Sequence, residues 1–331
     1  MLARTLAFLS FLAVALAAQA LSARETELAT LDEVVVTGTQ PGPGMWRVSN
    51  DQGHVLWVLG TLSPLPTKMQ WVSREVEETL KESQELILRP AARVGVNVGF
   101  LGALTLLPGA LGARKNPDGT LLKEVVPPED YARWVTLKKK YLGRNRGVEK
   151  RRPVLAAGKL YERAIRKSGL RDEDVVGAAV RKLAKRAKLV ITEPVVEVKI
   201  EDPRQALKEF KQTALDDLPC FRTTLDRLET DVGAMRARAN AWSTGDIDAL
   251  RALPYVDQGR VCTQAFLETS MAQKRGMSDL RERARTSWLH AVDAALARNQ
   301  SSVALIGITE LLQPDGVIAQ LQSRGYEVEA P

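Results

Sequence analysis

The sequence predicts an α/β fold in which a central sheet is built from an N-terminal hairpin and a C-terminal strand–helix–strand unit, with a large and mostly helical middle region. Three observations lead to this prediction. Two short apolar runs flank a turn near the start of the fold, helical periodicity dominates the middle, and a strand, a glycine turn, a helix and a last strand close the chain. The 331 residues suffice to bury a substantial core, and 45% hydrophobic content is ordinary for a globular protein.

Residues 1–20 have the pattern of a secretory signal peptide. Arg4 precedes an apolar run from Leu6 to Leu16, and small residues follow at Ala18 and Ala20. The run is short for a membrane span, so we expect cleavage near Ala20, a periplasmic or secreted protein, and no transmembrane span after cleavage. An uncleaved anchor is the alternative.

Residues 21–44 form a polar lead that we expect to be flexible. Within it, residues 31–39 (LDEVVVTGT) resemble the energy-coupling box of TonB-dependent outer-membrane receptors. Those receptors need a plug and a barrel, for which this chain is too short and too helical. We therefore interpret residues 31–39 as a β-prone tail and do not expect a contact with TonB.

The first elements of the fold follow from apolar runs and turn residues. Asn50 to Gly53 form a hairpin turn, and Pro64 and Pro66 end the second strand. Ser73 is of a residue type that caps helix N-termini, which places it at the start of the next helix. The predicted elements are strands at 45–49 and 54–59, a helix at 72–83 and a strand at 85–89.

Residues 94–113 are rich in glycine and almost uncharged. Their length approaches that of a membrane span, but Asn97, Pro108 and the repeated glycines argue against one. We expect a buried pair of helices or a lid over a cleft. Whether this segment touches a membrane stays open.

Helical spacing dominates the rest of the middle region. In the longest predicted helix, at 219–242, apolar residues alternate at spacings of four and three, which indicates a packed face and not a cofactor site. A strand from Leu189 through 195–200 interrupts the helices. The chain closes with a strand from Val303, a helix to Arg324 and a last strand at 325–329. The predicted helices lie at about 128–141, 153–168, 172–187, 203–214, 219–242, 246–252 and 279–298.

Cys220 and Cys262 are the two cysteines of the chain. In an exported protein two cysteines more often pair than stay free, so we predict a disulfide, with two buried thiols as the alternative. Closing this loop would stabilise the fold by about 4 kcal/mol in the chain-entropy account.

The formal net charge is +7, and part of it lies in clusters at 138–140, 144–152 and 181–188. A basic face can bind nucleic acid, anionic lipid or a polyanionic envelope sugar. No nucleic-acid motif accompanies the clusters, and export argues against such a partner, so we predict no nucleic-acid binding. A solvated basic surface is the simplest interpretation; binding of an anionic polymer or a membrane surface is the alternative.

Two glycine turns match each other. Each follows an apolar strand and carries a polar residue three positions after its glycine, namely Ser63 after Gly60 and Glu310 after Gly307. If both strands lie centrally in one sheet, both polar side chains emerge at its C-terminal edge, where open α/β sheets build their sites. This edge is the candidate site.

Several stretches resemble the TraB/GumN family, which includes the Tiki metalloproteases. The resemblance covers most of residues 45–329, and it implies a single domain over 45–331 with a helical insertion at about 94–300. The stretches are MWRVSNDQGHVLWVLGTLSPLP at 45–66, PPEDYARW at 127–134, RPVLAAGKLYERAIRKSGL at 152–170 and SVALIGITELLQPDGVIAQLQSRGYEVE at 302–329.

The resemblance also shows where this chain departs from the family pattern of two G-x-x-H motifs and an acidic residue that ends the strand after the first helix. It places the first histidine on Ser63, the second on Glu310 and the acidic residue on Arg89. A family Arg-Asn pair is half kept as Arg283-Ala284. The metal-binding and catalytic positions that the family implies are thus replaced almost one for one.

The replacing residues predict no tight catalytic metal. A divalent metal needs several converging His, Asp or Glu ligands, and an arginine near the ion would cost on the order of a few kcal/mol. His54 and His290 lie outside any ligand-spaced motif. Ser63 is a poor nucleophile candidate too, because Pro64 lacks the backbone N–H that an oxyanion hole would use.

Arg89 and Glu310 carry opposite charges at two former ligand positions, so we hypothesise that they form an ion pair, with Ser63 beside it, across the old cleft. The sequence favours an exported, catalytically inactive family member with a binding or scaffold role in the cell envelope and no cofactor. Its partner would be an envelope protein or an anionic polymer. The alternative is a metal-dependent peptidase or hydrolase that uses Mn or Co and altered ligands such as Glu310.

Overall fold

The computed structural model describes residues 42–71, 74–96, 98–213, 216–253, 255 and 257–331. The residues from 42 onward belong to one compact unit. The predicted signal peptide at 1–20, the segment at 31–39 and the predicted cap Ser73 lie outside the described residues.

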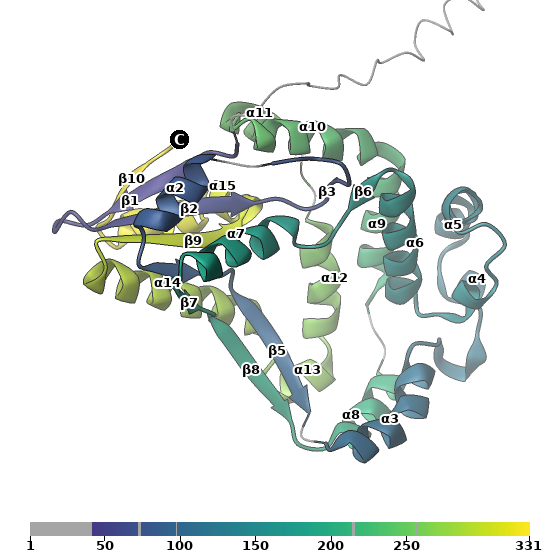
Figure 1. Cartoon of the computed structure of the whole chain (residues 1–331). Helices are drawn as coiled ribbons and strands as arrows, with labels where there is room; N and C mark the ends of the chain where they lie inside the picture. The colour runs from purple at the N-terminus through teal and green to yellow at the C-terminus, as the bar shows by residue number, and fades with distance from the viewer. Residues whose placement is uncertain (1–41, 72–73, 97, 214–215, 254, 256) are drawn as a thin grey trace, which may run out of the picture. The chain divides into compact units, whose positions relative to one another are not determined.

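The unit contains a six-stranded mixed sheet with the mostly helical region beside it (Figure 1), and the predicted α/β class is confirmed. β1 pairs antiparallel with both β10 and β2, whereas β2, β9, β4 and β7 run parallel. The carboxyl ends of the parallel strands therefore meet at one edge. The strands are, in the order β10-β1-β2-β9-β4-β7 across the sheet, Glu327–Glu329, Met45–Ser49, Val55–Thr61, Ser301–Gly307, Glu85–Ile87 and Val190–Thr192.

Helices cover the sheet, and their apolar side chains complete the main core. α2 packs against α7, and the long helix α14 contacts β2, β4 and β9. Trp288 of α14 is fully buried, and its Nε1 donates to the Leu305 carbonyl of β9 at 3.0 Å. These helices and their C-terminal neighbours are α2 (Arg74–Glu82), α7 (Val175–Arg186), α14 (Leu280–Arg298), α15 (Ile308–Leu312) and α16 (Val317–Ser323).

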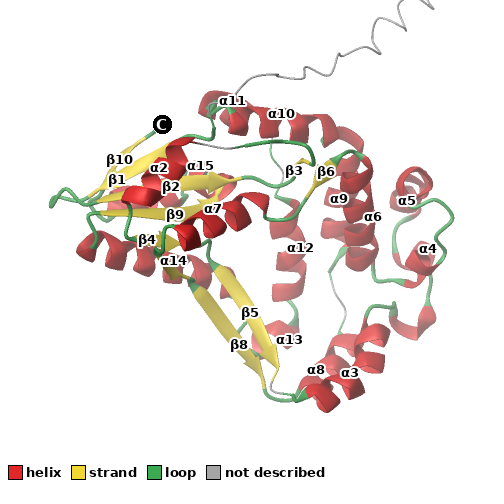
Figure 2. Ribbon diagram, in the orientation of Figure 1, coloured by secondary structure: helices red, strands yellow, loops and turns green. Residues whose placement is uncertain are grey.

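The helical middle region has a second core, in which Trp134, Leu160 and Phe221 are fully buried. The rings of Trp134 and Phe221 lie 5.5 Å apart and join two of the helices. Figure 2 shows this mostly helical region beside the strands of the sheet. The helices of the middle region, within and outside this second core, are α4 (Leu122–Val125), α5 (Pro128–Tyr141), α6 (Pro153–Lys167), α9 (Leu218–Thr230), α10 (Val232–Ser243), α11 (Ile247–Ala252), α12 (Gln258–Leu267) and α13 (Ser270–Lys274), with single 3₁₀ turns at Pro117–Gly119 and Gly147–Lys150.

The apolar face predicted at 219–242 is divided between two helices, because α9 ends and α10 begins at Asp231. The carboxylate of Asp231 binds one arginine from each helix, Arg227 at 3.3 Å and Arg238 at 2.6 Å. The prediction of one continuous helix is wrong. Apolar periodicity shows which face of a helix is packed, but it does not show that the backbone leaves the helical conformation at one residue. α12 and α13 were not predicted at all.

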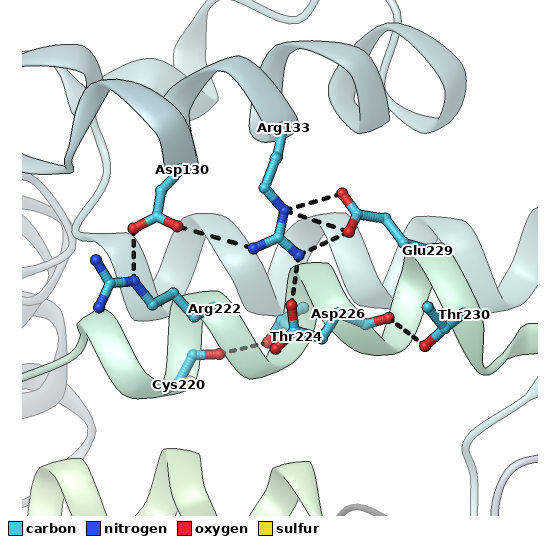
Figure 3. Close-up of polar contacts among 8 residues, drawn as sticks. All are labelled: Asp130, Arg133, Cys220, Arg222, Thr224, Asp226, Glu229 and Thr230. Atoms are coloured by element: carbon cyan, nitrogen blue, oxygen red, sulfur yellow. Dashed lines mark hydrogen bonds and ion pairs between the residues drawn. The ribbon is translucent and has the colours of Figure 1, made fainter.

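The predicted disulfide is present and joins α9 to α12 through Cys220 and Cys262. On the other side of α9, ion pairs join it to α5 (Figure 3). Arg133 of α5 donates to Glu229 at 2.6 Å, and Asp130 accepts from Arg222 at 2.6 Å. α9 is therefore held by a covalent bond on one side and by charge pairs on the other.

Residues 94–113 differ from the expectation of a buried helix pair or a lid. They contain the end of strand β5 and one helix, α3, in which four of the five leucines are exposed. Among the described residues no helix is long and apolar enough to cross a membrane. β5 (Ala91–Val96) pairs in parallel with β8 (Val195–Ile200), and α3 (Phe100–Ala113) packs against α8 (Pro203–Gln212).

Reducing the Cys220–Cys262 disulfide should lower the free energy of unfolding by about 4 kcal/mol, because the bond closes a loop between residues 42 positions apart. Guanidinium chloride unfolding with and without dithiothreitol measures the change. The double variant Cys220→Ala/Cys262→Ala is the control, and it should match the reduced protein. Equal free energies of unfolding for the oxidised and reduced proteins would contradict the prediction.

Candidate functional site

The two glycine turns lie side by side at the carboxyl edge of the sheet, as the sequence predicts. β2 and β9 are parallel neighbours, with Gly60 opposite Ile306 and Thr61 opposite Gly307. β4 pairs with the other side of β9 and ends at the same edge. Ser63, Glu310 and Arg89 therefore all leave the sheet at this edge.

Gly60 lets the two turns pack closely. A Cβ atom at this position would clash with Cδ1 of Ile308, the residue that follows Gly307, and would lie 3.3 Å from Cδ2 of Leu311. The Gly60 carbonyl also accepts a hydrogen bond from Nε1 of Trp242 at 2.7 Å. Trp242 belongs to α10, so this bond joins the first turn to the helical middle region.

Ser63 contacts a carboxylate of the segment that leads into α7. Its Oγ donates to Oδ1 of Asp172 at 2.9 Å. Partial burial of the carboxyl raises the pKa of Asp172, and the hydrogen bond from Ser63 and the charge of Arg227 offset only part of that rise. The same segment pairs with the chain after Ser63 through two short strands, β3 (Leu65–Pro66) and β6 (Leu170–Arg171).

Arg89 contacts the same segment two residues further on. Its Nη2 lies 3.0 Å from Oδ2 of Asp174. Asp174 is also the N-cap of α7, where its side chain accepts from the backbone N–H of Gly177 at 2.9 Å. Arg89 thus supplies a cation to a carboxylate that already stabilises a helix start.

Glu310 pairs with a different helix. Arg281, at the start of α14, donates to Oε1 of Glu310 at 3.2 Å, and it also lies 3.5 Å from Asp257. The hypothesis of an Arg89–Glu310 ion pair is therefore wrong for the structure as described. Each of the two side chains pairs with a different residue: Arg89 with Asp174, and Glu310 with Arg281.

Arg283 takes part in none of these contacts at the sheet edge. Its guanidinium lies 3.6 Å from Asp279 and donates to the Gly276 carbonyl at 3.1 Å. The arginine that reaches the edge is Arg281, which sequence reasoning missed. Both residues lie in the first turn of α14, and only the direction of each side chain separates them.

A pair of buried arginines near the edge was also missed. The side chains of Arg227 and Arg238 are 5% and 4% exposed, and both bind Asp231. Both guanidinium groups also lie over the ring of Tyr255, at 5.6 and 5.3 Å. Burial raises the pKa of the Tyr255 hydroxyl, so the ring stays neutral beneath the two cations. In the sequence these arginines are spaced like charges on the solvent-exposed face of a helix, so the sequence pattern did not indicate that they are buried.

A cavity of about 450 Å³ lies beside the two turns. Leu62 and Ile308 of the turns form part of its wall, together with Leu250. Arg238 and Arg251 give the cavity positive charge, and none of the described residues that line it is acidic. Apolar walls with a few polar groups are typical of small-molecule sites, so this cavity can hold a ligand with an apolar portion and an anionic group.

The residues at the edge do not fit a divalent metal. Within the described ranges, no three His, Cys, Asp or Glu side chains lie together so that they could hold one. Ser63 offers a hydroxyl, Arg89 is a cation, and the carboxylate of Glu310 is paired with an arginine. Metal sites need several converging anionic or imidazole ligands, which these positions do not supply.

The comparisons with known proteins identify a family. A model of the TraB/PrgY/gumN family matches residues 44–330, a range that includes both glycine turns. No match was found among curated proteins or among solved structures.

Asp172→Asn should change how stability depends on pH. Because the pKa of Asp172 is raised in the folded state, the folded protein binds the proton more tightly than the unfolded chain, and wild-type stability falls as the pH rises above the ordinary value of 3.8. An asparagine at this position does not titrate, so this loss of stability is absent, and its side-chain oxygen can still accept the hydrogen bond from Ser63. The stability of the variant relative to wild type should therefore increase from pH 3.5 to pH 7 in urea unfolding, and a constant difference would contradict the assignment.

Proposed function

The chain belongs to the TraB/PrgY/gumN family, and we propose that it is an exported, catalytically inactive member that binds an anionic component of the cell envelope. We infer the inactivity from the residues at three positions and from the contacts they make. The family resemblance implies metal-binding residues at these positions. This chain has Ser63, Arg89 and Glu310 there, and all three make polar contacts with the helical part of the fold.

These contacts connect the edge to other elements, and each of the three side chains has a polar partner. Ser63 and Arg89 bind the segment before α7, at Asp172 and Asp174, and Glu310 binds α14 through Arg281. General acid–base chemistry needs a group that is free to exchange a proton with a substrate. Side chains that are already paired serve as connections between elements instead.

Two observations support export. The disulfide between Cys220 and Cys262 is a bond that persists in oxidising compartments. The N-terminal sequence pattern of residues 1–20 is that of a signal peptide. Together they favour the periplasm or the outside of the cell.

The cavity supports the binding role. Its volume of about 450 Å³ lies within the range of small-ligand sites. Arg238 is oriented by Asp231 and stacks on Tyr255, so it is held in place before a ligand arrives. A preorganised cation in an apolar cavity favours an anionic group attached to an apolar chain.

The purified protein should hold no stoichiometric divalent metal after incubation with Mn²⁺ or Co²⁺ and gel filtration, and it should not cleave a fluorogenic peptide mixture. Metal content by mass spectrometry and peptide fluorescence measure both. Glu310→Ala is the matched variant, and it should behave as wild type. About one metal per chain that is lost in Glu310→Ala, together with metal-dependent cleavage, would establish the hydrolase alternative instead.

Decanoate, a probe with an apolar chain and a carboxylate, should bind in the cavity and be measurable by calorimetry. Arg251→Glu, at the cavity wall, should weaken binding by about tenfold through charge reversal, whereas Arg260→Glu, an exposed arginine that does not line the cavity, should not. Arg251 is the better choice than Arg238 because it is exposed and forms no buried pair. Equal affinities of wild type and Arg251→Glu would show that the cavity does not bind this class of ligand.

A further inference from the structure

Helix α3 carries leucines on its outer side. Leu101, Leu104, Leu107 and Leu111 are 76%, 46%, 52% and 57% exposed. The helix contains no charged residue. Single exposed leucines are common on protein surfaces, but four on one short helix form an apolar patch of the kind that marks an interaction site.

The less exposed side of α3 is made of glycines, alanines and one leucine, Leu106. A Cβ atom on Gly109 would lie 3.4 Å from Leu207 Cδ1 of α8, and one on Gly112 would lie 3.2 Å from Lys211 Nζ. Glycines therefore face the neighbouring helix, and four of the five leucines face outward. An ordinary surface helix shows the opposite arrangement, with its apolar stripe toward the core.

Basic residues lie on the neighbouring helix α8 and at the C-terminal end of α3. Arg204 of α8 donates to Thr105 Oγ1 of α3 at 3.0 Å, and Lys208 and Lys211 lie further along α8. Arg114 and Lys115 directly follow α3, and residues 86–117 contain no Asp or Glu. Of the acidic residues nearby, Glu209 is neutralised by Arg275 at 2.7 Å, while Glu201 and Asp202 lie before the start of α8.

We propose that α3 and α8 together form a docking site for an anionic lipid bilayer. The leucines of α3 enter the boundary between headgroups and acyl chains, and the arginines and lysines of α8 and of the end of α3 bind lipid phosphates. α3 has 14 residues, about 21 Å of helix, and lies in the plane of the interface without crossing it. Figure 1 shows both helices at the end of the β5–β8 pair that is remote from the six-stranded sheet.

The charge distribution favours a lipid surface over a second copy of the chain. A symmetric contact through the leucines would bring two sets of the same basic residues together, which is unfavourable. An anionic headgroup layer instead neutralises them. The inference concerns a surface that contributes no residue to the cavity beside the glycine turns, so it stands independently of the proposed ligand.

Co-sedimentation with vesicles tests the proposal. The full chain should bind phosphatidylcholine vesicles containing 30% phosphatidylglycerol more tightly than phosphatidylcholine alone, and added salt should weaken the difference. Leu101→Ser/Leu111→Ser should lower the affinity for the anionic vesicles by at least tenfold, because two leucines are withdrawn from the acyl boundary. Lys208→Glu/Lys211→Glu should remove the preference for anionic lipid.

Val135→Ser/Val190→Ser is the matched control, because these valines are 44% and 62% exposed at other places on the surface. It should bind as wild type. All variants share the same N-terminal sequence, so residues 1–20 contribute equally to each measurement. Thermal unfolding should be unchanged in the leucine variant, since the replaced side chains are exposed.

Two outcomes would overturn the proposal. One is equal binding of anionic vesicles by wild type and Leu101→Ser/Leu111→Ser. The other is a dimer, detected by light scattering, that the leucine substitutions dissociate while no variant binds vesicles, because a second copy would then cover the patch.

Discussion

The parallel pairing of β2 with β9 joins two segments from opposite ends of the described chain, and the site depends on it. The pairing places Thr61 opposite Gly307, so both turns leave the sheet at the same edge. The absence of a side chain at Gly60 lets Ile308 pack against the first turn. The long, mostly helical region between the two strands leaves the sheet at this edge, after Thr61, and returns to it at the opposite edge, at Ser301.

The helical region is connected to this edge by polar contacts from several elements. Trp242 donates to the Gly60 carbonyl, Asp172 accepts from Ser63, and Arg281 binds Glu310. These bonds come from α10, from the segment before α7 and from α14. Hydrogen bonds and ion pairs thus attach the helical region to both turns, and the proposed inactivity rests on this use of Ser63 and Glu310.

Charge is distributed unevenly over the molecule, and this connects the two proposals. Near the edge, Asp231 faces two buried arginines, and one of them, Arg238, reaches the cavity wall. At α3 and α8, exposed leucines adjoin arginines and lysines. Both places combine apolar surface with positive charge, so both favour anionic, partly apolar partners. Such partners are available at the cell envelope, where we propose that the protein works.

The sequence alone determined the features that depend on local pattern. Alternating apolar residues and a turn predict the hairpin of β1 and β2, Gly60 and Gly307 mark the two turns, and the chain has two cysteines that can pair. Only the tertiary structure decided which charges pair, because the partner of Arg89 or Glu310 is the opposite charge that packing brings closest, and sequence distance does not report that. It also decided the break at Asp231 and the outward leucines of α3. An uncharged apolar helix has no polar face to show which side is buried, so its exposure depends on the glycines that pack against α8.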